Sequence, residues 1–112
     1  MAQALTSLID ARTLNAFRQG VAIPAHPLAL TSRRTLDERR QRALARYYIA
    51  SGSGGLAVGV HTTQFQIRDP AIGLFRSVLT IARDEMDRAD RARAVPLMRI
   101  GGVTGPTARA CD

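Results

Sequence analysis

The chain alternates short apolar runs with longer segments in which apolar residues recur every three or four positions. Three apolar runs, at residues 20–25, 55–60 and 96–101, are candidate strands. Runs of this length are typical of strands that are buried on both faces of a parallel sheet. They begin at residues 20, 55 and 96, so that successive starts lie 35 and 41 residues apart.

The segments between these runs show the spacing of amphipathic helices. The spacing predicts helices near residues 4–18, 36–51 and 70–91. The order is therefore one helix, then a strand and a helix twice, then a third strand. Right-handed connections between such units give a parallel sheet.

Polar residues and glycines at the ends of the predicted helices mark where they start and stop. Thr35 and Glu38 match a capping box at the start of the second helix. Gly52 is expected to end that helix, because glycine readily takes a positive φ. Asp69 and Pro70 are expected to begin the third helix, as its N-cap and its first residue.

The strand spacing predicts a fold class within the α/β proteins. It is close to the roughly 30 residues per unit of a (β/α)₈ TIM barrel. We therefore expect one domain over residues 1–112, made of the first three strand–helix units of such a barrel and preceded by a short N-terminal helix. Three strands cannot close a barrel, and Asp112 falls where a third helix would be starting, so the chain is expected to be cut short.

Composition places the chain among small globular proteins. It has 112 residues, 46% of them apolar, which is enough for one domain. No apolar run approaches the roughly 20 residues that span a bilayer, and the first residues lack the pattern of a signal peptide. The lone Cys111 cannot form an internal disulfide. We therefore expect a cytoplasmic protein.

The charge is strongly positive, with a formal net charge of +7. Six arginines gather between residues 33 and 46, which keeps a small basic nucleic-acid-binding protein as one alternative function. In residues 83–91, however, acidic and basic residues alternate in the manner of a solvated helix face. Aromatic residues, on which bases stack, make up only 4% of the chain, so a nucleic-acid partner is not favoured.

All sixteen basic residues are arginines, and the chain contains no lysine. A desolvated lysine can form a Schiff base with a carbonyl substrate, whereas arginine stays protonated and does not. The chain as given therefore has no side chain for this kind of covalent catalysis.

Hydrogen-bonding side chains follow the first two predicted strands. His26 follows the first strand, and His61, Thr62 and Thr63 follow the second. The loops after the strands are where barrel enzymes place their sites, and a threonine pair offers hydroxyls and backbone N–H groups to a carboxylate or an oxyanion. We treat all four as candidate substrate-binding residues. Alternatively, His26 bonds a loop carbonyl and the threonines only cap the strand.

Other kinds of site find little support. The glycine-rich turn at residues 100–107 has neither the spacing of a dinucleotide fingerprint nor the lysine of a Walker loop. No Asp, Glu or Cys is spaced to join His26 and His61 as metal ligands. We therefore expect no metal, no cofactor and no catalytic triad.

The string Gly-Val-His-Thr-Thr-Gln-Phe at residues 59–65 is the most specific feature of the chain. Together with residues 20–30, 46–48 and 100–107, it resembles the N-terminal part of a dihydrodipicolinate synthase family protein. That family belongs to the N-acetylneuraminate lyase superfamily of (β/α)₈ enzymes. The resemblance spans roughly residues 21–107, or about three of the eight barrel units. The commoner form of the string is Gly-Thr-Thr-Gly-Glu, so a divergent subgroup is the better match.

The resemblance implies class I aldolase-type chemistry on 2-oxo acids. In such a lyase a lysine on a later strand forms the Schiff base, assisted by a tyrosine, and a threonine pair holds the substrate carboxylate. Thr62 and Thr63 match that pair, whereas neither the lysine nor the tyrosine lies in this segment. The family thus implies a Schiff-base lyase or aldolase, and the chain alone is expected to be inactive.

A further alternative is a non-catalytic interaction or oligomerisation module. A three-stranded parallel sheet keeps exposed edges and a poorly covered face. The rest of a barrel, or a second chain, would have to cover them.

Overall fold

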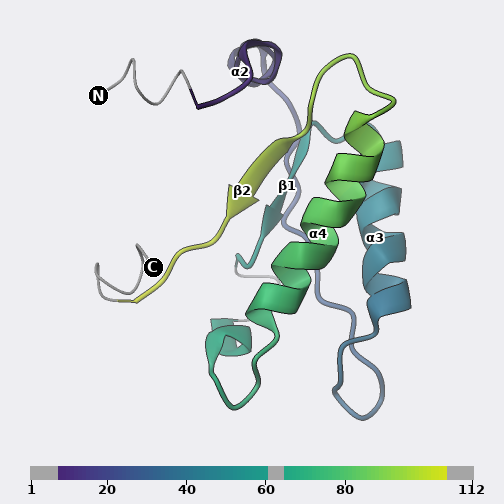
Figure 1. The fold of residues 1–112 in the computed structure, drawn as a ribbon, viewed down its shortest axis with the longest axis vertical. Coiled ribbons are helices and arrows are strands. Elements are labelled where there is room, and N and C mark those ends of the chain that lie inside the picture. Colours follow the sequence, from purple (N-terminus) through teal and green to yellow (C-terminus); the bar gives the residue numbers. More distant parts are fainter. Residues whose placement is uncertain (1–7, 61–64, 106–112) are drawn as a thin grey trace.

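The computed structural model describes residues 8–60 and 65–105. These residues form a mixed α/β fold (Figure 1). The helices are α2 (Ala11–Gln19), α3 (Glu38–Ala50), the 3-10 helix η2 (Phe65–Arg68) and α4 (Phe75–Asp90). The strands are β1 (Gly55–Val58) and β2 (Met98–Gly101).

The two strands form a small parallel sheet. Gly55 lies opposite Met98, and the register continues to Val58 opposite Gly101. Among the described residues, β2 has no strand on its other edge. The expected parallel pairing of the second and third apolar runs is therefore confirmed.

The first apolar run, at residues 20–25, lies along the other edge of β1 but is not a regular strand. A single parallel bridge joins Ala25 to Ala57, and the Ala57 N–H donates to the Pro24 carbonyl at 3.0 Å. The His26 N–H donates in turn to the Ala57 carbonyl at 2.8 Å. The predicted strand was wrong in this respect, because Pro24 has no N–H to add to the ladder.

The other two predicted strands are present but shorter. The strand predicted over residues 55–60 ends at Val58, since Gly59 turns the chain with a φ of +73°. The strand predicted over residues 96–101 begins at Met98.

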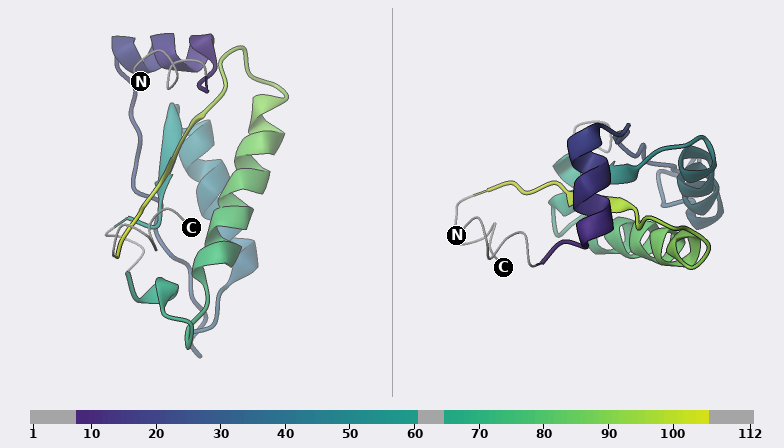
Figure 2. Two further views of the ribbon diagram at one scale, coloured as in Figure 1. Left: turned by 60° about the vertical axis from the view of Figure 1, so that its left-hand side comes forward. Right: turned by 90° about the horizontal axis from the view of Figure 1, so that it is seen from above.

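Both longer helices, α3 and α4, lie on the same face of the sheet (Figures 1 and 2). α2 lies across the ends at which the strands begin (Figure 2). The Thr13 hydroxyl donates to the Pro96 carbonyl at 3.0 Å, and Arg12 Nη1 donates to the Ala94 carbonyl at 3.0 Å. The amino ends of the strands are thus covered, and the helix predicted near residues 4–18 is present from Ala11 onward.

The core lies between the sheet and the two longer helices. Leu56 is fully buried and Val58 is 2% exposed, because alternate residues of β1 point toward the helices. They pack in one cluster with buried side chains of α3, α4 and the start of the last run: Ala45, Val78, Ala82, Met86 and Leu97.

The start of α3 differs from the predicted capping box. Asp37 is the N-cap, and its Oδ1 accepts from the Arg40 N–H at 3.0 Å. Thr35 instead lies in the preceding turn, where its hydroxyl is 2.7 Å from that of Thr31. The end of the helix is as predicted, because Gly52 follows it with a φ of +99°.

The start of α4 was also misplaced. Asp69 does not cap the helix: its Oδ1 accepts from the Ala71 N–H at 2.9 Å, and its carbonyl accepts from the Gly73 N–H at 2.8 Å. This closes a separate turn. Gly73 has a φ of +63°, which a helix cannot include, so α4 begins only at Phe75.

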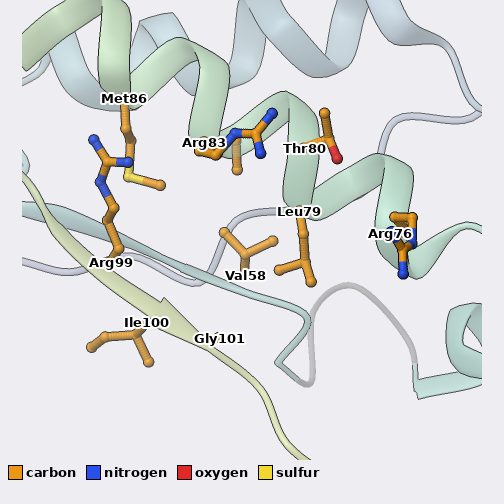
Figure 3. A pocket seen from close by; sticks show the side chains of 10 residues that line it. Val58, Arg76, Leu79, Thr80, Arg83, Met86, Arg99, Ile100 and Gly101 are labelled. Atoms are coloured by element: carbon orange, nitrogen blue, oxygen red, sulfur yellow. The ribbon is translucent and has the colours of Figure 1, made fainter. Parts of the chain in front are cut away.

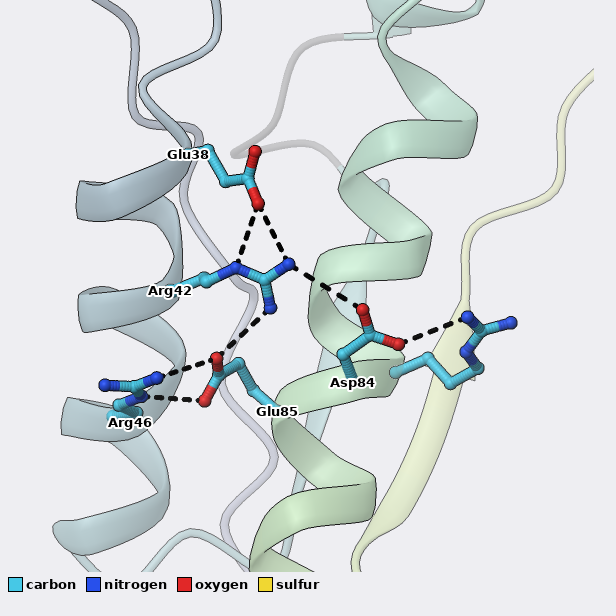
Figure 4. Close-up of polar contacts among 6 residues, drawn as sticks. Glu38, Arg42, Arg46, Asp84 and Glu85 are labelled. Atoms are coloured by element: carbon cyan, nitrogen blue, oxygen red, sulfur yellow. Dashed lines mark hydrogen bonds and ion pairs between the residues drawn. The ribbon is translucent and has the colours of Figure 1, made fainter.

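A buried carboxylate joins α3 to α4 (Figure 4). Glu85 is 4% exposed and accepts from Arg46 Nε at 2.8 Å and from Arg42 Nη1 at 3.3 Å. These bonds, that to Arg46 first, hold the pKa of Glu85 below its usual value. Two arginines of the predicted basic cluster therefore serve as ion-pair partners within the fold.

A groove of about 290 Å³ lies between α4 and β2 (Figure 3). Its lining combines apolar side chains with arginines: Val58, Leu79 and Met86, with Arg76, Arg83 and Arg99. Arg99 is held in ion pairs with Asp87 and Asp90. The groove marks where the helix-bearing face of β2 is left uncovered by the described residues.

Candidate functional site

The carboxyl ends of the parallel segments meet at one end of the sheet, which is where ligands bind in open α/β sheets. Residue 26, Gly59 and Gly102 mark this end. His61, Thr62 and Thr63 follow Gly59 by two to four positions and lie outside the described residues. Their expected binding roles therefore stay predictions.

Arg68, the last residue of η2, ties these strand ends together. Its Nη2 donates to the carbonyl of Gly59, which follows β1, and to the carbonyl of Gly102, which follows β2, the latter at 2.9 Å. The Gly102 N–H also donates to the Val58 carbonyl at 2.8 Å. The half-buried guanidinium therefore fixes both ends of the segment that carries Thr62 and Thr63, from Gly59 to Arg68 itself.

The two glycines are required by this close approach. A Cβ on Gly102 would lie 2.2 Å from the Gly59 carbonyl oxygen and 2.8 Å from Arg68 Nη2. A Cβ on Gly59 would meet the Phe75 ring at 2.6 Å, and Gly59 also has a positive φ. Only glycine allows the two carbonyls and the guanidinium to come together here.

Aromatic rings surround the Arg68 guanidinium. Its central carbon lies 4.2 Å from the centre of the Phe75 ring and 5.4 Å from that of Phe65. Cation–π contacts of this kind stabilise a charge that is partly withdrawn from water. Arg68 has no carboxylate partner in the part of the chain that the structure describes, and its Nη1 is buried without a hydrogen-bond partner.

Sequence reasoning missed Arg68. It is one arginine among sixteen, and its position follows no period. The available signal was indirect: Gly59 lies near the end of one predicted strand and Gly102 follows another, and such glycines permit close approach of another group to the backbone.

His26 lies in the interior, between the sheet and α3. Its side chain is fully buried, and Nδ1 lies 3.3 Å from Gln41 Nε2. The Gln41 amide is oriented by two backbone groups: its oxygen accepts from the Ala29 N–H at 2.7 Å, and its nitrogen donates to the Pro27 carbonyl at 3.1 Å. Nδ1 is therefore the acceptor, and the ring proton is on Nε2.

Burial governs the titration of His26. Nε2 is buried and has no hydrogen-bond partner, and desolvation lowers the pKa of the ring from its usual 6.5. The neutral ring supports the loop that follows residue 25 through Gln41. The binding role expected for His26 is not tested by this placement, which gives the side chain a structural contact with α3.

The folded protein should lose stability in mild acid because of His26. Below pH 6.5 the unfolded histidine binds a proton that the folded histidine does not. The free energy of unfolding should therefore decrease as the pH is lowered, by up to about 1.4 kcal/mol per pH unit. Urea unfolding between pH 7.5 and 5 would measure this. The His26→Leu variant should show a flatter profile over that range, and parallel profiles for the two proteins would contradict the assignment.

Within residues 8–60 and 65–105, no three His, Cys, Asp or Glu side chains are grouped so as to hold a metal ion. The same part of the chain includes no helix with both the length and the apolar character needed to cross a membrane. What this end of the sheet supplies is a guanidinium that can bind oxygen acceptors.

Comparisons with known proteins found no match to this chain. No family model matches its sequence, and no curated protein matches it. No solved structure matches its fold. The function must therefore be argued from the residues and their geometry.

Proposed function

We propose that the chain forms the first three strand–helix units of a (β/α)₈ barrel of the dihydrodipicolinate synthase type. One observation carries this proposal. The run at residues 20–25, β1 and β2 lie side by side in chain order and run parallel, with α3 and α4 on one face. Successive units of a barrel have this arrangement, since their connections are right-handed.

In this proposal the protein is cytoplasmic, and the strand ends carry the carboxylate-binding half of a site for a 2-oxo acid. Thr62 and Thr63 bind the carboxylate through hydroxyls and backbone N–H groups, with His61 beside them. Arg68 supports them by fixing the ends of β1 and β2. The Schiff-base lysine is absent from the chain, so the segment binds the acid and does not cleave or condense it.

Borohydride trapping tests the missing chemistry. The chain is incubated with pyruvate and borohydride, and its mass is measured before and after digestion. We expect no stoichiometric adduct on any side chain, while a class I aldolase treated in parallel is fully labelled. A stoichiometric adduct mapped to a side chain would refute the proposal that this chain binds the 2-oxo acid without forming a Schiff base.

Threonine variants test the binding half. Replacing Thr62 and Thr63 by valine removes both hydroxyls and nearly preserves side-chain volume. We expect pyruvate binding, measured by calorimetry, to weaken about tenfold or more. Thr104→Val is the matched control at an exposed position and should leave binding unchanged. Equal affinities for all three proteins would exclude the threonine pair as the carboxylate site.

Among the described residues one edge of β2 is unpaired, which favours a second candidate, an assembly module without catalysis. The apolar groove beside α4 and the unpaired strand edge are surfaces that partner chains commonly cover. Sedimentation should then show dimers or larger species at micromolar concentration. A monodisperse monomer that unfolds cooperatively would count against this candidate.

A further inference from the structure

The further inference concerns the unused donor group of Arg68. A buried N–H group without an acceptor costs free energy, and the cost is larger when the group is charged. Arg68 Nη1 is such a group, because it is closed to solvent and finds no hydrogen-bond partner. Nη2 of the same side chain is already occupied by two backbone carbonyls.

The charge of Arg68 is also uncompensated in the described structure. The buried carboxylate of Glu85 is met by two arginines, and Arg99 is met by two aspartates. Arg68 meets two carbonyl dipoles and two aromatic rings, none of which carries a full negative charge. A cation that is partly withdrawn from water is stabilised by an anion beside it, and the described residues supply none to Arg68.

The position of Arg68 suits a ligand better than a purely internal partner. The guanidinium lies at the carboxyl ends of β1 and β2, which is the ligand-binding end of a parallel sheet. Phe75, whose ring lies against the guanidinium, is the first residue of α4, and the first turn of that helix contains no acidic residue. The groups that contact Arg68 carry only partial negative charges, and an anion reaches the buried Nη1 once a neighbouring side chain moves aside.

We propose that Arg68 is the anchor of an oxyanion subsite, in which Nη1 donates to a carboxylate or phosphate group of a small molecule. This subsite is argued from Arg68 alone and goes beyond the proposed binding of a 2-oxo acid by Thr62 and Thr63. In the bound state the anion completes the hydrogen bonding of Nη1 and neutralises the guanidinium, while Nη2 keeps its contacts with Gly59 and Gly102.

The test is an NMR titration of the full chain with two probes at constant ionic strength, inorganic phosphate and pyruvate. We expect the side-chain N–H signals of Arg68 to shift in a saturable way with at least one probe. Phosphate alone would identify a phosphorylated ligand, and pyruvate alone a carboxylate. If neither probe shifts these signals, or if all arginine signals shift equally, the subsite is refuted.

Variants separate this subsite from general attraction to a basic protein. Arg68→Gln should weaken binding of the active probe about tenfold or more, and Arg68→Lys should give an intermediate loss, because lysine keeps the charge without the planar fork. Arg18→Gln, an exposed arginine on α2, removes the same charge and should change binding less than twofold. Equal losses for Arg68→Gln and Arg18→Gln would overturn the proposal.

Folding and the two proposals can be told apart in the same experiment. Where Arg68→Gln fails to fold, the Arg68 signals of the unmodified chain and the Arg68→Lys variant decide the outcome. If the variant with valine at residues 62 and 63 loses pyruvate binding but keeps the Arg68 response to phosphate, both sites stand. If pyruvate never binds but phosphate shifts Arg68, the oxyanion subsite stands and the 2-oxo acid function fails.

Discussion

Replacing Leu56 with alanine should lower the free energy of unfolding by about 2–5 kcal/mol, the range for buried Leu→Ala changes. Leu56 is fully buried in β1 and packs in the cluster that joins the sheet to both longer helices. A domain of this size has only about 5–15 kcal/mol of stability in total, so the loss is a large share of it.

Urea unfolding followed by circular dichroism would measure this effect. Leu8→Ala is the matched control, because Leu8 is 81% exposed and its truncation should change stability by less than about 0.5 kcal/mol. If the two substitutions had similar effects, the core would not lie between β1 and the helices.

The second large effect is expected at the ends of the strands. Gly102→Ala places a Cβ 2.2 Å from the Gly59 carbonyl oxygen and 2.8 Å from Arg68 Nη2. Because the Gly59 carbonyl is rigid backbone, relief requires Gly102 to move away from Gly59, which pulls apart the two carbonyls that Arg68 joins. We expect a loss of about 1–3 kcal/mol of stability, together with weaker binding of anions at Arg68.

The neighbouring glycine provides a control for Gly102→Ala. A Cβ on Gly101 would meet nothing within 4 Å, and Gly101 has no positive φ. Gly101→Ala should therefore be neutral or slightly stabilising, since it reduces the freedom of the unfolded chain. Equal destabilisation by both substitutions, or unchanged anion binding in Gly102→Ala, would contradict the contact between Gly102, Gly59 and Arg68.

The elements of the fold were largely predictable from sequence periodicity. Both described strands lie inside predicted apolar runs, and α3 ends where Gly52 was expected to end it. The starts of α3 and α4 were less predictable, because several polar residues compete to cap each one. Asp37, and not Thr35, caps α3, because the Thr35 hydroxyl is hydrogen-bonded to that of Thr31. The turn closed by Asp69 precedes α4, so this helix begins only at Phe75.

The candidate site was less predictable than the fold. Sequence position alone placed His26 at a strand end, but the side chain turns inward because the Gln41 amide binds both its ring and the adjoining loop. Arg68 was missed because its role depends on Gly59 and Gly102, 9 and 34 residues away in the chain. Contacts of this kind become visible only when the strands are placed side by side.

The proposed function has two parts: the chain binds a 2-oxo acid, and it forms no Schiff base with it because it lacks a lysine. NMR of pyruvate labelled with carbon-13 at its carbonyl carbon tests both parts in one titration. We predict saturable broadening or shift of the ketone signal, lost in the chain with valine at residues 62 and 63, and no imine signal. An unchanged ketone signal at saturating protein, or a new imine carbon, would contradict the proposal.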